Sequence, residues 1–126
     1  MGSKNRVLVW VVDDADSVRQ SLAAVLETAD IQVQGYPSAK AFLDDFEPDS
    51  TGCLIVDHHM PDMTGLELLQ HLRVRDTKIP TIFITGRGDA AMTENALKAG
   101  AIAVLNKPVD GDELITLIES VMLNNK

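Results

Sequence analysis

The stretch RVLVWVVDD at residues 6–14 decides the fold, because a continuous apolar run ends there in two adjacent carboxylates. An apolar run without polar alternation is typical of a parallel strand that helices cover on both faces. Three later runs are similar: CLIV precedes Asp57, TIFI precedes Thr85, and IAVLN precedes Lys107. In an open α/β sheet the ligand crevice lies at the carboxyl ends of the strands, so we expect these polar side chains to share one pocket.

The segments between these runs have the apolar spacing of amphipathic helices. From residue 17 to 29, apolar residues recur at i, i+4, i+7 and i+8 and form one stripe. The alternating IQVQGY at 31–36 is typical of an edge strand. The expected strands are 6–12, 31–36, 52–57, 79–85 and 102–106. The expected helices are 17–29 with Asp16 as N-cap, 39–46 with Ser38 as N-cap, and 65–75. We also expect a weaker helix that Asp89 caps and that ends before Gly100, and a last helix that Asp110 caps.

Strict alternation of strand and helix predicts an α/β fold with a doubly wound parallel sheet, because right-handed crossovers place helices on both faces. With 31–36 at an edge, the flavodoxin-like strand order 2-1-3-4-5 fits best, with five strands and five helices. The switch point of that order lies between the first and third strands. Asp13, Asp14 and Asp57 fall there, so the topology predicts that three carboxylates meet.

Length and charge narrow the functional classes. A chain of 126 residues is about one domain, and we expect that domain to span 6–124, with 1–5 as a disordered or vector-derived N-terminus. The net charge of −8 disfavours direct binding to nucleic acid or to anionic membranes. No run is long enough for a membrane helix, and the single Cys53 suits a reducing compartment, so we expect a cytoplasmic protein.

The predicted pocket suits phosphoryl chemistry. Carboxylates that approach one another repel unless a cation joins them, and oxygen ligands with open positions favour Mg²⁺ or a similar divalent ion. Lys107 would supply a point charge and Thr85 a hydrogen-bond donor for phosphoryl oxygens. Asp57 is the best-placed nucleophile, because it is a single acid at the end of a buried central strand.

Four motifs in order resemble the receiver domain of bacterial two-component response regulators over essentially the whole chain. They are VVDD at 11–14, DHHMPDMTG at 57–65, ITG at 84–86 and KAGAIAVLNKP at 98–108. The sequences MPDMTG and ITGRGD are most similar to the FixJ-type branch. The resemblance implies a CheY-like fold and a signalling switch that promotes its own phosphorylation and dephosphorylation, rather than an enzyme.

The resemblance also implies the roles of the acidic residues. Asp57 would be the phosphoacceptor. Asp14 would bind Mg²⁺ (or Mn²⁺) directly, Asp13 would bind it through water, and Asp57 and the backbone carbonyl of His59 would complete the protein ligands. The phosphoryl donor would be a sensor histidine kinase or a histidine phosphotransfer protein. Members of this branch often carry a LuxR-type DNA-binding domain, so the resemblance implies a C-terminal output domain absent from this chain, and it allows a homodimer.

The remaining implied roles concern the switch. Thr85 would be the switch hydroxyl, Lys107 would grip the phosphoryl group, and the bond from Lys107 to Pro108 would be cis. One position departs from the family pattern, since receivers usually carry Tyr or Phe where this chain has Val104. We therefore expect Thr85 to move on phosphorylation while the surface of the fourth helix, fifth strand and fifth helix changes less, or by another route.

Other interpretations explain fewer of these residues. A degenerate receiver that acts without phosphorylation would be missing part of the acid, hydroxyl and lysine set, which is complete here. An Asp-nucleophile phosphatase of the haloacid dehalogenase type needs a second acid where His59 stands. A flavodoxin-like cofactor site needs a phosphate loop where Asp13 and Asp14 would repel phosphate. A zinc site built from the three histidines, His58, His59 and His71, is disfavoured by their placement on a strand end and a helix flank.

Overall fold

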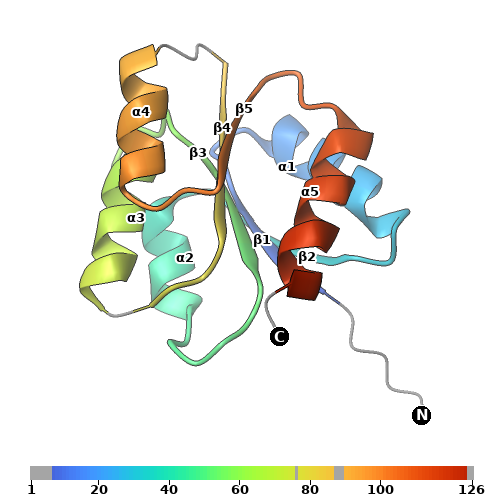
Figure 1. Cartoon of the computed structure of the whole chain (residues 1–126), viewed down its shortest axis with the longest axis horizontal. Coiled ribbons are helices and arrows are strands. Elements are labelled where there is room, and N and C mark those ends of the chain that lie inside the picture. Colours follow the sequence, from blue (N-terminus) through green and yellow to red (C-terminus); the bar gives the residue numbers. More distant parts are fainter. Residues whose placement is uncertain (1–6, 76, 87–89, 125–126) are drawn as a thin grey trace.

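A five-stranded parallel sheet lies between two layers of helices in the computed structural model, which describes residues 7–75, 77–86 and 90–124 (Figure 1). The strands are β1 (Leu8–Val12), β2 (Gln32–Tyr36), β3 (Cys53–Asp57), β4 (Thr81–Thr85) and β5 (Ala103–Asn106). The helices within these residues are α1 (Asp16–Glu27), α2 (Ala39–Asp45), α3 (Gly65–Val74), α4 (Ala90–Lys98) and α5 (Gly111–Asn124).

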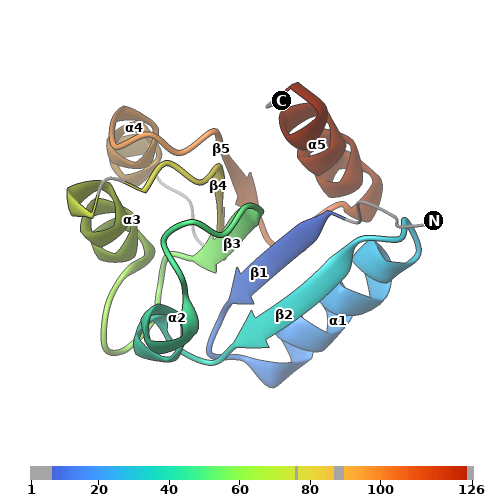
Figure 2. The ribbon, with the colours of Figure 1, turned by 90° about the horizontal axis from the view of Figure 1, so that it is seen from below.

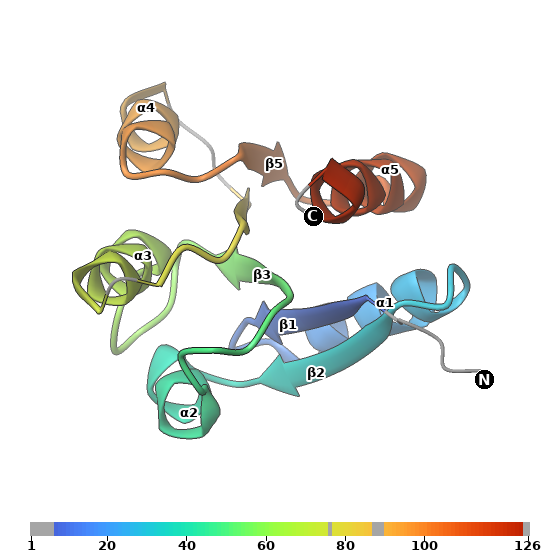
Figure 3. The ribbon, with the colours of Figure 1, turned by 60° about the horizontal axis from the view of Figure 1, so that its bottom comes forward.

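The strand order is β2-β1-β3-β4-β5, with every neighbouring pair parallel. Helices α1 and α5 cover one face of the sheet, and α2, α3 and α4 cover the other (Figures 2 and 3). The predicted flavodoxin-like order and the edge position of the second strand are therefore confirmed. The chain reverses its direction of winding between β1 and β3, and both strands end at the upper edge of the sheet in Figure 1.

The continuous apolar run of β1 supplies both cores at once. Successive side chains of a strand point to opposite faces, so Val9 and Val11 pack with α1 and α5, whereas Trp10 and Val12 pack with the opposite helical layer. Strands β3 and β4 are buried at every residue. This burial on both faces explains why the central strands show no polar alternation.

Local capping confirms part of the predicted boundaries. The Ser38 hydroxyl accepts a hydrogen bond from the Ala41 N–H at 3.0 Å, and an Asp110 carboxylate oxygen accepts one from the Glu113 N–H at 3.0 Å. The predicted helix 17–29 instead ends at Glu27, because Asp30 then takes a left-handed backbone with φ 62°. The predicted cap at Asp89 lies outside the described residues.

The prediction that Asp16 caps the first helix is wrong. The N-cap position is Ala15, and Asp16 is the first helical residue, where its carboxylate pairs with Arg19. Among the described residues, no side chain caps α1; the Ala15 N–H, just before the helix, donates to Asp13 Oδ1 at 2.9 Å. A carboxylate of the functional edge therefore also contacts the backbone just before α1.

The end of α4 is set by Gly100, as predicted. Its φ of +111° is in the left-handed region that favours glycine. The Ala101 N–H donates to the Ala96 carbonyl at 3.0 Å and the Gly100 N–H to the Leu97 carbonyl at 3.1 Å, which is the Schellman pattern.

Among the described residues, no helix is long and apolar enough to cross a membrane.

Phe42 provides a test of the core beneath α2. Its fully buried ring packs against the rings of Trp10, Tyr36 and Phe46, with centroid distances of 5.9, 5.5 and 5.1 Å. We expect Phe42→Ala to lower the free energy of unfolding by about 3–5 kcal/mol, because it leaves a cavity in a dense cluster. Urea denaturation measures this change. The control Val74→Ala, at a side chain 87% exposed, should change stability by less than about 0.5 kcal/mol.

Candidate functional site

Three carboxylates converge at the carboxyl edge of the sheet. Asp13 and Asp14 follow β1, and Asp57 ends the neighbouring β3. One potential ligand atom from each lies within 4.8 Å of the others. Asp13 is fully buried and Asp57 is 4% exposed, whereas Asp14 is exposed. The switch point of the sheet thus brings together the three acids that the sequence placed there.

The Lys107 ammonium contacts two of these carboxylates. Its Nζ lies 3.1 Å from Asp13 Oδ2 and 3.5 Å from Asp57 Oδ1. The Lys107 backbone N–H donates to the Thr85 carbonyl at 2.8 Å, which fixes the start of this loop to the end of β4. The peptide bond from Lys107 to Pro108 is cis, as the family resemblance implied.

The surroundings of Asp57 disfavour the ionised form of its carboxyl group. Burial raises the pKa of Asp57 above its ordinary value, and the Asp13 carboxylate raises it further, against the opposing effects of Lys107 and a backbone hydrogen bond from His59. Burial would lower the pKa of Lys107, but its hydrogen bonds and Coulombic attraction to Asp13 and Asp57 raise that pKa. The ammonium is thus held charged, while ionised Asp57 remains under-compensated.

The two acids of the β1–α1 loop, Asp13 and Asp14, differ in how far other protein groups already contact their carboxylates. Asp13 accepts the Ala15 N–H at Oδ1 and faces the Lys107 ammonium at Oδ2. Its backbone N–H donates to the Tyr36 carbonyl at 3.1 Å, and its carbonyl accepts from Arg19. Asp14 is exposed, so its carboxylate is accessible to an incoming ion, whereas the Asp13 carboxylate already contacts the Ala15 N–H and the Lys107 ammonium.

A pocket of about 510 Å³ opens beside the acids and is lined by Asp57, His59, Gly86 and Lys107. A Cβ added to Gly86 would have no heavy atom within 4 Å, so this side of the pocket is open. Thr85, which we expected in the pocket, is fully buried at the end of β4 and directly precedes the lining residue Gly86. The pocket offers an acid and an ammonium at a size that admits a phosphoryl group.

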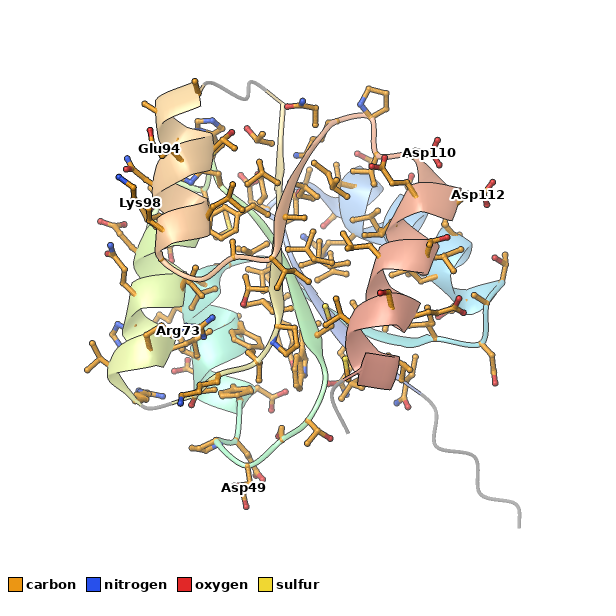
Figure 4. The ribbon with its side chains drawn as sticks, in the orientation of Figure 1. Asp49, Arg73, Glu94, Lys98, Asp110 and Asp112 are labelled. Carbon is orange, nitrogen blue, oxygen red and sulfur yellow. The ribbon has the colours of Figure 1, made fainter. Side chains whose placement is uncertain are left out.

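Within the part of the chain that the structure describes, neither the histidines nor the other acidic residues add to this cluster. Among the described residues, the group that could hold a metal consists of the three aspartates and contains no histidine. The rings of His58 and His59 contact each other with a centroid distance of 4.9 Å. Figure 4 shows Asp49 at the opposite end of the sheet, and Glu94 pairs with Lys98 at 3.4 Å on the outer side of α4.

Two further residues bear on function. Val104 lies on β5 opposite Phe83 and packs, partly buried, against the core on the side of α2, α3 and α4. Arg19 donates to the Asp13 carbonyl, and sequence analysis did not single it out, because an arginine on an amphipathic helix is ordinarily a solvated residue. Its spacing of three from Asp16 is the sole local signal, and this signal indicates an ion pair rather than a site.

Comparison with known proteins identifies the family. The model of the family described as response regulator receiver domain matches residues 9–119. The chain belongs to the response regulator receiver domain family. This receiver domain is 41% identical to the transcriptional regulatory protein FixJ of Azorhizobium caulinodans over 112 residues, which is 89% of this chain and 53% of that protein. It is 45% identical to FixJ of Rhizobium meliloti over 112 residues, 88% of this chain and 54% of that protein.

Solved structures agree with this assignment. The receiver domain matches a crystal structure of FixJ-N with a TM-score of 0.83 and 43% identity, over 92% of this chain and 93% of that one. It matches the response regulator StyR with a TM-score of 0.87 and 41% identity, over 95% of this chain and 61% of that one. The chain spans about half the length of the curated relatives it matches.

The raised pKa of Asp57 makes the free energy of unfolding depend on pH. Because the pKa of Asp57 in the folded receiver domain lies above its ordinary value of 3.8, the free energy of unfolding falls as pH rises from 3.8 through the folded pKa. Asp57→Asn removes this loss. We therefore expect the metal-free variant to melt at a higher temperature than the wild type at about pH 7, with the difference shrinking toward about pH 4.

Differential scanning calorimetry across that pH range checks this expectation. Asp112→Asn, which neutralises an exposed acid at the start of α5, is the control and should not show the same pH-dependent gain. A metal-free Asp57→Asn protein that melts below the wild type at neutral pH would contradict the electrostatic account.

Proposed function

We propose that Asp57 is the phosphoacceptor of this receiver domain. The observation that carries the proposal is the position of its carboxylate, which lines the open pocket, contacts Lys107 at 3.5 Å and belongs to the acidic cluster. It combines a nucleophilic oxygen, a cation for the incoming phosphoryl group and a place for a metal. Asp13 and Asp14 do not line this pocket.

The metal in this proposal is Mg²⁺ or Mn²⁺. The donor set fits a hard divalent cation, since it consists of carboxylate oxygens that meet within 4.8 Å and leave one side open to solvent. Asp14 would ligate directly, Asp13 through water, and Asp57 and the His59 backbone carbonyl would supply the remaining protein oxygens. When bound, the ion neutralises negative charge on the carboxylates and on the phosphoryl oxygens.

The reaction we infer is an in-line phosphoryl transfer. An Asp57 carboxylate oxygen attacks the phosphorus of a phosphohistidine, the P–N bond breaks, and its electron pair leaves with the imidazole nitrogen. The product is an acyl phosphate on Asp57. The Lys107 ammonium then pairs with a phosphoryl oxygen, which the flexible side chain of a lysine suits, because it acts as a mobile point charge.

The switch that follows would run through Thr85. The hydroxyl of Thr85, buried at the end of β4, would follow a new phosphoryl oxygen. The transfer would thereby be converted into a change of shape near α4. A histidine kinase or a phosphotransfer protein would be the donor, and a C-terminal output domain the recipient of the change.

The wider biological setting is also proposed. The FixJ proteins are named as transcriptional regulatory proteins, and the aligned region makes up only 53% and 54% of their lengths, which supports an output domain beyond α5. The acidic charge of −8 is unsuited to DNA, so DNA contacts would belong to that output domain. We place the protein in the cytoplasm, as a signalling switch that is a monomer or a homodimer.

The direct test is acyl phosphate formation from a small donor. Incubated with acetyl phosphate and Mg²⁺, the wild-type chain should gain a single ~80 Da phosphoryl adduct by intact mass spectrometry, because Asp57 is the nucleophile. Asp57→Asn should gain none. The control Asp112→Asn, at an exposed acid outside the pocket, should gain the adduct as the wild type does.

Each alternative function has its own outcome in that experiment. A degenerate receiver would show no adduct on the wild type, and an Asp-nucleophile phosphatase would turn over phosphate esters continuously. Persistence of the adduct on Asp57→Asn would reject Asp57 as the acceptor.

Removal of Mg²⁺ with a chelator should abolish labelling of the wild type, since the charge of the cluster is then uncompensated.

Val104 leads to a separate prediction about the switch. In receivers with Tyr or Phe at this position, the aromatic ring swings inward when the switch hydroxyl moves. Val104 has no such ring, so the α4–β5–α5 surface should respond less than the active site. Amide chemical shifts recorded with and without beryllofluoride measure both regions. We expect large shifts around Asp57 and the loop after β4, and small ones along β5 and α5. Equally large shifts over that whole face would contradict this.

A further inference from the structure

The Arg19 side chain reaches back from α1 over the loop that carries Asp13 and Asp14. Its Nη1 donates to the Asp13 backbone carbonyl at 2.6 Å, and its Nη2 pairs with the Asp16 carboxylate. The side chain is 19% exposed, so most of it lies against the protein rather than in solvent. An arginine can hold both acceptors at once because its guanidinium presents donors in a fixed planar fork.

The path of Arg19 is made possible by a glycine in the edge strand. A Cβ added to Gly35 of β2 would lie 3.2 Å from Arg19 Cδ, so the arginine stem crosses the strand where no side chain intervenes. Gly35 pairs with Val11 of β1, two residues before Asp13. A glycine inside a strand often marks such a close approach. Gly35 and Arg19 together bind α1 to the end of the sheet.

Arg19 completes the restraint of the Asp13 backbone. On one side the Asp13 N–H donates to the Tyr36 carbonyl, and on the other its carbonyl accepts from Arg19. The Asp13 carboxylate in turn receives the Ala15 N–H. Without Arg19, the peptide between Asp13 and Asp14 loses its anchor, and the orientation of this peptide decides where both carboxylates point.

We propose that Arg19 is a positioning residue of the metal site, which fixes the Asp13–Asp14 peptide so that both carboxylates face Asp57. This inference rests on the proposed function, since it assigns the acidic cluster to Mg²⁺. Arg19 would touch neither the metal nor the phosphoryl group. It would act through the Asp13 carbonyl and through its pairing with Asp16.

A second effect of Arg19 has the opposite sign. Its positive charge, on the backbone of the loop that carries Asp13 and Asp14, would weaken binding of a cation, so charge alone predicts that removing Arg19 tightens Mg²⁺ binding. The Asp16 carboxylate compensates that charge locally. Positioning therefore dominates, and the two effects can be separated by variants that differ in charge and in geometry.

The experiment measures the dissociation constant of Mg²⁺ by calorimetry for the wild type, Arg19→Met and Arg19→Lys. Arg19→Met should weaken Mg²⁺ binding about tenfold, as is usual when a partner that orients a ligand is removed. Arg19→Lys keeps the charge but lacks the fork, so it should also weaken binding. The control Lys40→Met removes an exposed cation on α2 with the same change in net charge and should not weaken binding.

A second readout uses the metal-free protein. The amide of Ala15, which is bonded to Asp13 Oδ1, should exchange with solvent faster in Arg19→Met, because the loop opens more often. Amides in the buried β3 should keep their protection if the fold is intact. Faster exchange confined to the loop, together with weaker Mg²⁺ binding, is the expected signature of positioning.

Contrary outcomes have distinct meanings. Tighter Mg²⁺ binding by Arg19→Met with unchanged binding by Arg19→Lys would overturn positioning in favour of charge alone. Unchanged Mg²⁺ binding by both variants would overturn the inference while leaving phosphorylation of Asp57 untouched. A wild type that binds Mg²⁺ yet gains no acyl phosphate would reject the proposed function and leave the role of Arg19 standing. A wild type that does not bind Mg²⁺ would overturn both.

Discussion

The contact that the site depends on is the ammonium of Lys107 between two buried carboxylates, Asp13 and Asp57. Three acids and one ammonium leave a formal charge of 1 − 3 = −2 at this edge when all are ionised. Burial makes that excess costly, which is why the pKa of Asp57 is raised despite the lysine. One divalent cation would cancel the excess. Binding of such an ion would therefore relieve the excess.

The fold serves this contact by placing strand ends side by side. Asp13 and Asp57 are neighbours because β1 and β3 flank the switch point, and Lys107 reaches them because its backbone is bonded to the end of β4. The continuous apolar strands supply two cores, so the central strands are fixed on both faces. Side chains at their ends consequently have little freedom to separate, even though two of the three acids are buried and like-charged.

Much of this arrangement could be predicted from sequence. A continuous apolar run indicates a strand that is buried on both faces, and the polar residue after it marks the edge of the sheet. The convergence of Asp13, Asp14 and Asp57 followed from strand order alone. The predicted cap at Asp16 was wrong because Asp16 is already the first helical residue, and α1 begins after Ala15 without a side-chain cap from any described residue. Arg19 was missed because its bond to a backbone carbonyl and its passage over Gly35 depend on tertiary packing, which no local spacing encodes. Thr85 was expected in the pocket but is buried beside it, because β4 is covered on both faces to its last residue.

If Asp57 is the phosphoacceptor, it alone becomes an acyl phosphate. Borohydride reduces an aspartyl phosphate to homoserine, and tandem mass spectrometry then locates the altered residue. After treatment with acetyl phosphate and Mg²⁺, we expect homoserine at position 57 and unaltered aspartate at positions 13 and 14. Homoserine at either of those positions, or a phosphoryl group recovered on His59, would contradict that expectation.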